Sequence, residues 1–477
     1  MSILRTGLAL AAFTASALAQ AQTPSPAALP PGMTRVTSVE GITEYRLANG
    51  LQVLLVPDDS KPTTTVNVTY RVGSRMESYG ETGMAHLLEH LMFKGTPTHK
   101  NLLGEFSKRG LRANGTTWYD RTNYFASFSA NDDNLRWYLG WQADAMVHSN
   151  IARSDLDTEM TVVRNEMERG ENSPSRILLE KMSAAMYQWH NYGKSTIGAR
   201  ADVENVDIAH LQAFYREYYQ PDNATLIVAG RFDTPKTLAW TAELFGKIPR
   251  PTRKIPPTYT LDPAQDGERT VTLRRVGGAP LVFAGYHMPT GASPDSAAAD
   301  LLAAILGEAP SGRLHRKLVE GQLAASTFGY TYTLAEPGPI FLGAQLAPGQ
   351  DVERARQVML ATIESFATEP VTAEELERAR TQWLKSWELG FTDPEQIGVQ
   401  LSEAIGTGDW RLFFIMRDHV RKLTQADLQR VATQYLVTDN RTVGLYLPTD
   451  KPQRAPAPAR VDVAAMVKDY KIGRAHV

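Results

Sequence analysis

The chain has 477 residues, of which 43% are hydrophobic, so it is long enough for about two to four globular domains. Its formal net charge is −2 and it has no long run of like charges, which argues against nucleic acid or an acidic membrane surface as a partner. It has no cysteine, which excludes disulfides and thiolate metal sites and leaves His, Asp and Glu as the strong metal ligands.

Residues 1–21 have the pattern of a secretory signal peptide. Arg5 precedes the apolar stretch 7–18, and residues 17–19 or 19–21 offer a small-residue cleavage site. The apolar stretch is shorter than the roughly 20 residues that span a bilayer, and no later segment is long and apolar enough. We therefore expect a periplasmic or secreted bacterial protein without a membrane span.

Proline-rich segments divide the rest of the chain into two blocks. We predict linkers at residues 22–36 and 251–266 and a tail at residues 451–477. The remaining residues form two predicted domains, at 37–250 and 267–450.

Both blocks mix strands and helices. Alternating or β-branched runs predict strands at residues 51–59, 63–74, 123–130 and 223–230 of the first block and at 270–276, 280–288, 326–333 and 340–347 of the second. Helical spacing occurs at residues 81–93, 133–149, 155–170 and 207–219. We expect an α+β fold of two tandem domains, each a mainly antiparallel sheet with helices packed on one face.

The helix predicted at residues 81–93 carries two histidines and a glutamate in an apolar sequence. His86 and His90 are four residues apart, so their rings lie on one face and could bind one metal ion. Glu89 lies beside them, where it can accept a proton from a water instead of binding the metal. This H-x-x-E-H spacing predicts a zinc site that needs a third protein ligand.

The ordinary alternative is a helix that buries these side chains for packing. A chance H-x-x-E-H in a chain of this composition is roughly a one-in-a-hundred event. Burying two imidazoles and a carboxylate without partners is costly, and a metal removes that cost. The metal site is therefore the favoured interpretation.

The helix predicted at residues 155–170 supplies candidates for the third ligand. Glu159 and Glu166 are seven residues apart and share one face. We expect Glu166 to bind the metal and Glu159 to orient a histidine through its second ring nitrogen. Spacing alone does not choose between them and does not exclude Glu168. Taken by itself, the pair would be better explained as a solvated charged face.

The two blocks resemble each other near their ends. Residues 211–230 align with residues 428–447 without a gap, so that Leu211 matches Leu428 and Asn223 matches Asn440. A repeat of such long period indicates a duplicated domain and not a solenoid.

These motifs resemble the pitrilysin and insulysin family of zinc metallopeptidases, which includes the mitochondrial processing peptidases. The resemblance covers about residues 38–450 and rests on "HLLEH" followed by "KGT", on "NGTTWYDRTNY" (114–124) and on the spaced glutamates. It implies tandem α+β domains, one Zn²⁺ per chain and hydrolysis of peptide bonds. The implied roles are zinc ligands for His86, His90 and Glu166, general base for Glu89 and auxiliary acid for Glu159.

The resemblance also implies how a peptide binds. In this family an extended peptide adds to a sheet edge near the zinc, through main-chain hydrogen bonds. Residues 114–128 resemble the region beside that edge, so Asn114 is a candidate substrate-binding residue. Asn followed by Gly is, however, first of all a turn signal.

The second block lacks the metal-binding residues. Asp300, Ala303 and Ala304 stand where His86, Glu89 and His90 stand in the first block. Family members also supply an Arg and a Tyr from a domain opposite the zinc to stabilise the oxyanion. Val319 and Ala325 stand at those positions here. We therefore expect a second peptidase-like half, either a separate subunit or a missing C-terminal part, to supply the Arg and Tyr.

The end of the chain bears on that expectation. Residues 472–477 read "IGRAHV", which resembles the translation of a sequencing adapter, so we expect a truncated or artefactual end. An ordinary disordered tail is the alternative.

The leading hypothesis is an exported zinc metalloendopeptidase that hydrolyses peptides or unfolded polypeptide segments. One alternative is a noncatalytic scaffold or assembly subunit, which the intact metal-site residues oppose. Another is a catalytic half that is inactive without its partner, which assays with and without the second half would distinguish.

Overall fold

The structure is a computed structural model that describes residues 28–470. The predicted signal peptide and the sequence "IGRAHV" lie outside the described residues. Among the helices of residues 28–470, none combines the length and the apolar character that a membrane crossing needs.

The first half is built on a seven-stranded sheet with strand order β1-β2-β3-β7-β4-β6-β5. Its strands are β1 (Met33–Val39), β2 (Ile42–Leu47), β3 (Gln52–Pro57), β4 (Thr63–Tyr70), β5 (Arg112–Thr117), β6 (Thr122–Ser129) and β7 (Ala224–Gly230). All neighbours are antiparallel except β3 and β7. β1 begins inside the range predicted as a linker, because it pairs with β2 and that pairing is not visible in a proline-rich segment.

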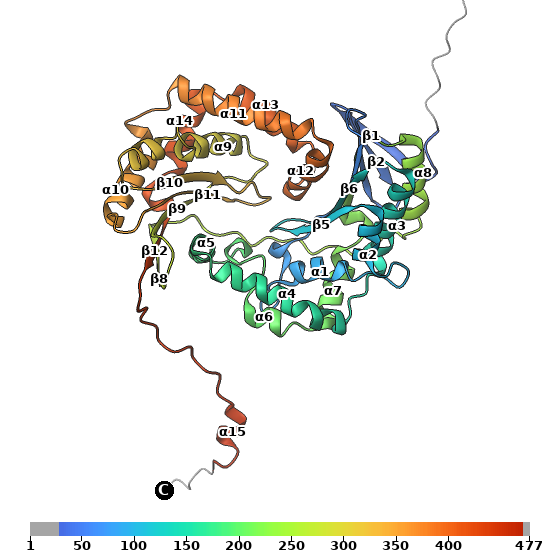
Figure 1. The fold of residues 1–477 in the computed structure, drawn as a ribbon, viewed down its shortest axis with the longest axis horizontal. Helices are drawn as coiled ribbons and strands as arrows, with labels where there is room; N and C mark the ends of the chain where they lie inside the picture. The colour runs from blue at the N-terminus through green and yellow to red at the C-terminus, as the bar shows by residue number, and fades with distance from the viewer. Residues whose placement is uncertain (1–27, 471–477) are drawn as a thin grey trace, which may run out of the picture.

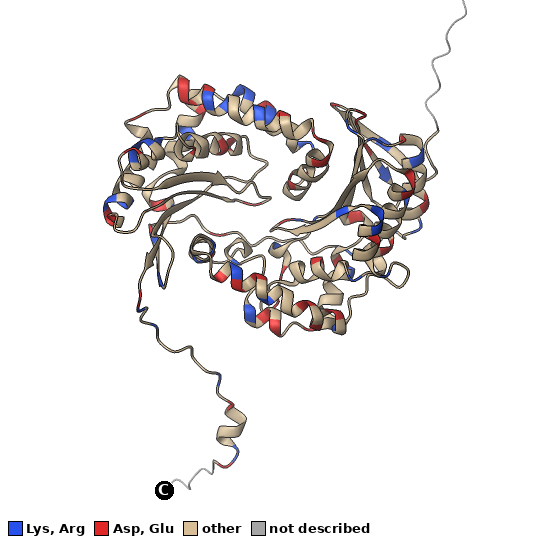
Figure 2. Cartoon of the chain, in the orientation of Figure 1, with Lys and Arg blue, Asp and Glu red and all other residues tan. Residues whose placement is uncertain are grey.

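The helices of the first half cover this sheet and extend beyond it (Figure 1). They are α1 (Met84–Met92), α2 (Leu102–Arg109), α3 (Asp132–His148), α4 (Arg153–Glu171), α5 (Pro174–Met186), α6 (Arg200–Glu204), α7 (Ile208–Tyr218) and α8 (Thr234–Phe245). The charged residues gather on the outer helices, whereas the strands carry few (Figure 2).

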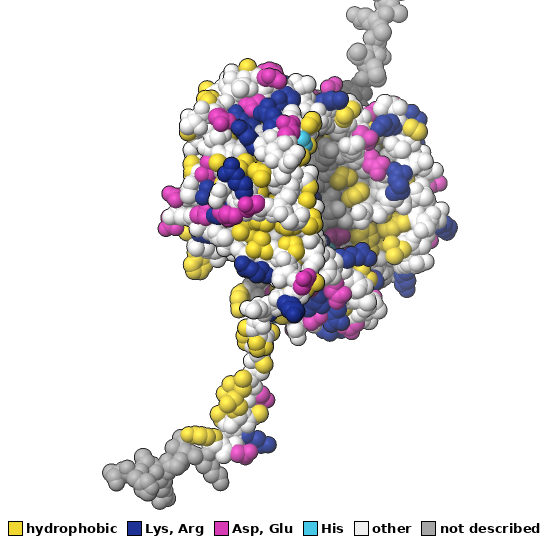
Figure 3. All heavy atoms as spheres, turned by 60° about the vertical axis from the view of Figure 1, so that its left-hand side comes forward, with side chains coloured by type: hydrophobic (Ala, Val, Ile, Leu, Met, Phe, Trp, Pro, Cys, Tyr) yellow, Lys and Arg dark blue, Asp and Glu magenta, His cyan; other side chains and the backbone are white. Residues whose placement is uncertain are grey.

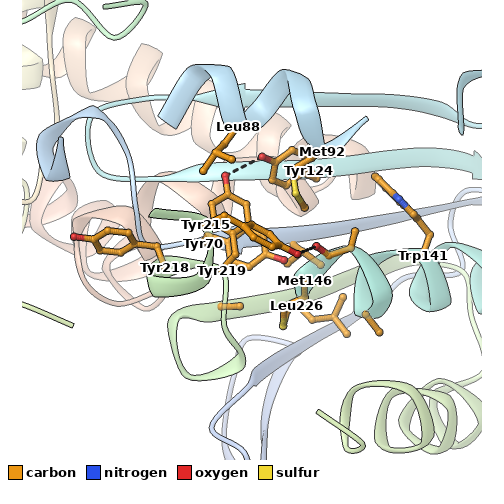
Figure 4. Close-up of a cluster of buried hydrophobic side chains, with 14 of the residues drawn as sticks. Tyr70, Leu88, Met92, Tyr124, Trp141, Met146, Tyr215, Tyr218, Tyr219 and Leu226 are labelled. Carbon is orange, nitrogen blue, oxygen red and sulfur yellow. Dashed lines mark hydrogen bonds between the residues drawn. The ribbon is translucent and has the colours of Figure 1, made fainter. Parts of the chain in front are cut away.

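Buried aromatic side chains lie between α1 and the sheet (Figure 4). Tyr70 of β4 stacks on Tyr219 with ring centroids 4.3 Å apart. The hydroxyls of Tyr124 and Tyr219 are 2.9 Å apart and form a buried hydrogen bond. Leu88 and Met92 of α1 are fully buried in the same core, which fixes which face of α1 points away from it.

The second half repeats the plan on a five-stranded sheet with order β10-β11-β9-β12-β8. Its strands are β8 (Arg269–Arg275), β9 (Leu281–His287), β10 (Ser326–Thr331), β11 (Pro339–Gln345) and β12 (Arg441–Pro448). Its helices are α9 (Pro294–Gly307), α10 (Val352–Ile363), α11 (Ala373–Phe391), α12 (Pro394–Thr407), α13 (Leu412–Lys422) and α14 (Gln425–Tyr435), and the short α15 (Val463–Val467) follows in the tail. The predicted α+β class with two similar, mainly antiparallel domains is confirmed.

Each half also covers part of the other. α12 packs on β4 and β7 of the first sheet, and α5 packs on β8, β9 and β12 of the second (Figure 1). The buried amide of Asn67 donates hydrogen bonds to the carbonyl of Gly398 at 2.8 Å and to Ser402 Oγ at 2.7 Å. This exchange of helices holds the halves together beside a hollow in the surface (Figure 3).

Candidate metal centre

The start of α1 is held by a buried carboxylate. Glu77 is 4% exposed and accepts hydrogen bonds from the backbone N–H groups of Gly83 and Ala85, both at 2.9 Å. Burial raises the pKa of Glu77 to about 8, against the opposing effect of these two hydrogen bonds. The side chain satisfies N–H groups that the helix itself leaves free, immediately before His86.

Three predicted ligands converge from α1 and α4. His86 Nε2 and His90 Nε2 each lie 3.5 Å from the same carboxylate oxygen, Oε2 of Glu166. The ligand atoms of these three residues all lie within 4.8 Å of one another. Two atoms bound at about 2.0–2.1 Å to a tetrahedral zinc ion are about 3.3–3.4 Å apart, so this arrangement fits zinc.

The second ring nitrogen of each histidine has a different environment. His90 Nδ1 is 3.0 Å from Glu159 Oε2, and Lys94 forms an ion pair with the other oxygen of Glu159. Burial alone would raise the pKa of Glu159, but the hydrogen bonds from Lys94 and His90 lower it. The carboxylate therefore stays ionised and can fix the tautomer of His90 that exposes Nε2.

His86 lies deeper. Its Nδ1 is buried and has no hydrogen-bond partner among residues 28–470. Burial, with smaller effects of His90 and Arg176, lowers the pKa of His86 to about 3. The imidazole is therefore neutral at pH 7, which is the form that binds a metal.

Glu89 lies beside the three converging ligand atoms, but its carboxylate contacts strand β5 instead. Its Oε2 accepts a hydrogen bond of 3.0 Å from Thr117 Oγ1 on β5. Burial raises the pKa of Glu89, against the effects of His90 and Thr117. A Cβ atom at Gly115 would come within 3.1 Å of Glu89 Oε1, so the lack of a side chain there leaves room for the carboxylate.

Asn114 lies in strand β5 and not in a turn. It pairs with Phe125 of β6 and its side chain is exposed. β5 is at the end of the sheet, so within residues 28–470 its other side has no partner strand. The edge is therefore open to an added strand, next to the metal-ligand cluster.

One cavity of about 710 Å³ joins these groups. Its wall contains the six residues that the sequence singles out, namely His86, Glu89, His90, Asn114, Glu159 and Glu166. Glu168 lies outside this wall, is exposed and lies 3.8 Å from Arg200. The roles of these residues stay predictions, but the structure places the six together.

Thr117 and Lys94 contact the predicted site residues, although neither was itself predicted as a site residue. Both lie in segments that the sequence did single out, since Lys94 begins "KGT" and Thr117 lies in "NGTTWYDRTNY". Their contacts with Glu89 and Glu159 depend on how α4 and β5 pack against α1.

At the matching position of the second half, Asp300 is half-buried and accepts hydrogen bonds from Thr331 Oγ1 and Trp383 Nε1. Burial raises the pKa of Asp300. Within residues 28–470, the only group of three clustered metal-ligating side chains is the one in the first half.

Replacing Glu159 by Gln is expected to weaken zinc binding by about 10- to 100-fold, because His90 loses a charged acceptor. Competition with a chromophoric chelator measures the change. Asp157→Asn, an exposed change on the same helix, is the matched control and should leave the affinity as it is. Equal affinities for the two variants would contradict a role of Glu159 in orienting His90.

Comparison with known proteins identifies relatives of both halves. A family model described as "Insulinase (Peptidase family M16)" matches residues 52–200, and one described as "Peptidase M16 inactive domain" matches residues 205–383. "Zinc protease PqqE" of Helicobacter pylori is 30% identical over 411 residues, 84% of this chain and 91% of that protein. "Uncharacterized zinc protease YmxG" of Bacillus subtilis is 24% identical, over 72% of this chain and 82% of that protein.

Solved structures show the same fold. A protease from Helicobacter pylori matches with a TM-score of 0.81 and 28% identity, covering 85% of this chain and 99% of that one. The periplasmic protease PqqL from Escherichia coli matches with a TM-score of 0.71 and 19% identity, covering 87% of this chain and 48% of that one. The family resemblance of the sequence is thereby confirmed.

Proposed function

Because the chain belongs to the insulinase family of peptidases, family M16, we propose that it is an exported zinc metalloendopeptidase that cleaves peptides or unfolded segments. The observation that carries the proposal is the convergence of His86, His90 and Glu166 at 3.5 Å spacing, with Glu89 beside them. The leader-like residues 1–21 support export to the periplasm or beyond.

In the proposed reaction the chain supplies a general base, a metal site and a strand edge that binds the peptide. A zinc ion held by His86, His90 and Glu166, one per chain, would acidify water and polarise the scissile carbonyl. Glu89 takes the proton from the attacking water and returns it to the leaving amine. Burial raises the pKa of Glu89, which strengthens its carboxylate as a base, and Thr117 holds it in place.

The open edge of β5 supports an extended peptide as the substrate. A peptide strand added there would use the free main-chain groups of β5, with Asn114 beside it. Because such a contact needs an extended backbone, folded proteins would be poor substrates. This favours peptides and unfolded segments.

We also propose that a second peptidase-like half completes the site. Arg313 of this chain is buried and donates hydrogen bonds to Glu375, the shorter of which is 2.7 Å long. Its guanidinium is therefore already paired inside the second half. The Arg and the Tyr that stabilise the oxyanion would then come from another half, either a separate subunit or an additional part of the polypeptide. A noncatalytic scaffold role is the second candidate, and the zinc-compatible geometry argues against it.

Metal removal tests the proposal. The purified chain loaded with zinc should cleave members of a quenched fluorescent peptide library, lose turnover after treatment with a chelator, and regain it when zinc is restored. A parallel arm adds a catalytically inactive M16 half that carries the Arg and Tyr. Zinc-loaded protein that cleaves nothing in either arm would overturn the peptidase assignment and favour the scaffold.

A further inference from the structure

A second cavity opens next to the metal centre. It has a volume of about 440 Å³ and shares Arg176 and Thr196 with the cavity around the zinc ligands. Trp118, which also lines it, directly follows the last residue of β5. A peptide lying along β5 would therefore pass the mouth of this cavity close to its scissile bond.

Two cations in the wall of this cavity have no anionic partner. Arg176 on α5 and Lys194 form no ion pair or side-chain hydrogen bond within residues 28–470, unlike most basic residues near them. Glu180 is the only carboxylate among the described lining residues, and it pairs with Lys181 at 3.1 Å. The cavity therefore presents an excess of positive charge to whatever enters it.

The position of Arg176 is restricted by packing. A Cβ atom at Gly170 of α4 would lie 3.0 Å from Arg176 Nε, so the guanidinium rests directly on the backbone of the helix that carries Glu166. This contact places the charge at the boundary of the two cavities. A close, oriented guanidinium binds a carboxylate better than a free surface cation does.

One side of the wall is aromatic, and the remaining neutral lining residues are Ser, Thr and Leu. Trp118 meets Tyr332 of the second half edge to face, with ring centroids 5.2 Å apart, and Tyr119 is buried beside them. Such a wall suits the methylene groups of a short side chain and lowers the exposure of its charged end to water. Tyr332 makes the cavity depend on both halves of the chain.

We propose that this cavity is a specificity subsite that selects peptides with an acidic side chain, Asp or Glu, next to the scissile bond. An acidic side chain would pair with Arg176 and Lys194 while its methylene groups contact the aromatic wall. A basic side chain would meet two like charges, and an apolar one would remove water from two cations without replacing it. The inference rests on the proposed peptidase function, because it names the substrate class of that same site.

Isosteric peptides test the subsite. Peptides that differ only by Glu or Gln are compared at each of the positions flanking the bond that the zinc-loaded full chain cleaves. At one position kcat/KM should favour Glu by about tenfold, the effect of a charge-assisted hydrogen bond. The preference should weaken as salt is added, since screening reduces the attraction.

Variants assign the effect to the two cations. In Arg176→Gln/Lys194→Gln the ratio for Glu over Gln should fall to about one, with zinc content retained, because both partners of the acidic side chain are neutral. Lys247→Gln/Lys422→Gln removes the same charge from exposed positions outside both cavities and should keep the ratio. A ratio that falls equally in both double variants would show a general charge effect and overturn the subsite.

A binding measurement separates this inference from the proposed function. Fluorescence anisotropy on zinc-loaded Glu89→Gln gives dissociation constants for the same Glu and Gln peptides without turnover. Cleavage without any Glu preference would overturn the subsite and leave the peptidase function standing. If nothing is cleaved, the peptidase function fails, and equal dissociation constants would overturn the subsite while tighter binding of the Glu peptides would support it.

Discussion

Glu89→Gln is expected to lower kcat by about 10²- to 10⁴-fold, because the amide cannot accept the proton of the attacking water. The change keeps the shape of the side chain and the contact with Thr117, and Glu89 is not one of the three converging ligands. Zinc content should therefore stay at about one ion per chain. Turnover of a quenched peptide together with metal analysis of the same sample measures both quantities.

The pairing of these two measurements makes the result specific. A variant that loses zinc together with turnover would show that Glu89 supports the metal and is not simply a base. Turnover equal to that of the native chain would remove Glu89 from the reaction. Thr117→Val, which deletes only the hydrogen bond to Glu89, should give a smaller loss of kcat, of about tenfold.

Glu166→Ala is expected to abolish stable zinc binding, while Glu168→Ala should leave it as in the native chain. Glu166 supplies the carboxylate oxygen on which both histidines converge, whereas Glu168 is exposed on another face of the same helix. The loss of affinity should exceed the roughly 10- to 100-fold cost of losing an outer hydrogen-bond partner. Competition with a chromophoric chelator measures it.

Thermal unfolding tests the same two variants independently. A ligand that binds only the folded state stabilises it, so zinc should raise the Tm of the native chain and of Glu168→Ala. It should not raise the Tm of Glu166→Ala. A zinc-dependent shift of equal size in both variants would contradict the assignment of Glu166.

Local patterns in the sequence predict much of the candidate site. Residues four apart on a helix share a face, so the position of His86 beside His90 on α1 follows from spacing alone. The same reasoning placed Glu159 and Glu166 on one face of α4. It left Glu168 open, because the rotation of α4 toward α1 depends on packing between helices that are far apart in the chain.

Two other features could not be predicted, because they also depend on contacts between segments that are far apart in the chain. Asn followed by Gly is a turn signal, yet Asn114 lies in the edge strand β5, because pairing with β6 outweighs local preference. The exchange of α5 and α12 between the halves also has no local signature. It depends on which apolar face is left to be covered once both sheets have formed.

The α+β class, the duplication and the candidate metal-ligand residues could be predicted from the sequence, because periodicity and spacing along one element are set by local geometry. The folded chain was needed to show that Lys94 pairs with Glu159, that Thr117 donates a hydrogen bond to Glu89 and that Arg176 and Lys194 line one cavity. These contacts join segments far apart in the chain. Their distances depend on how the helices and strands pack, and no spacing within one segment encodes that packing.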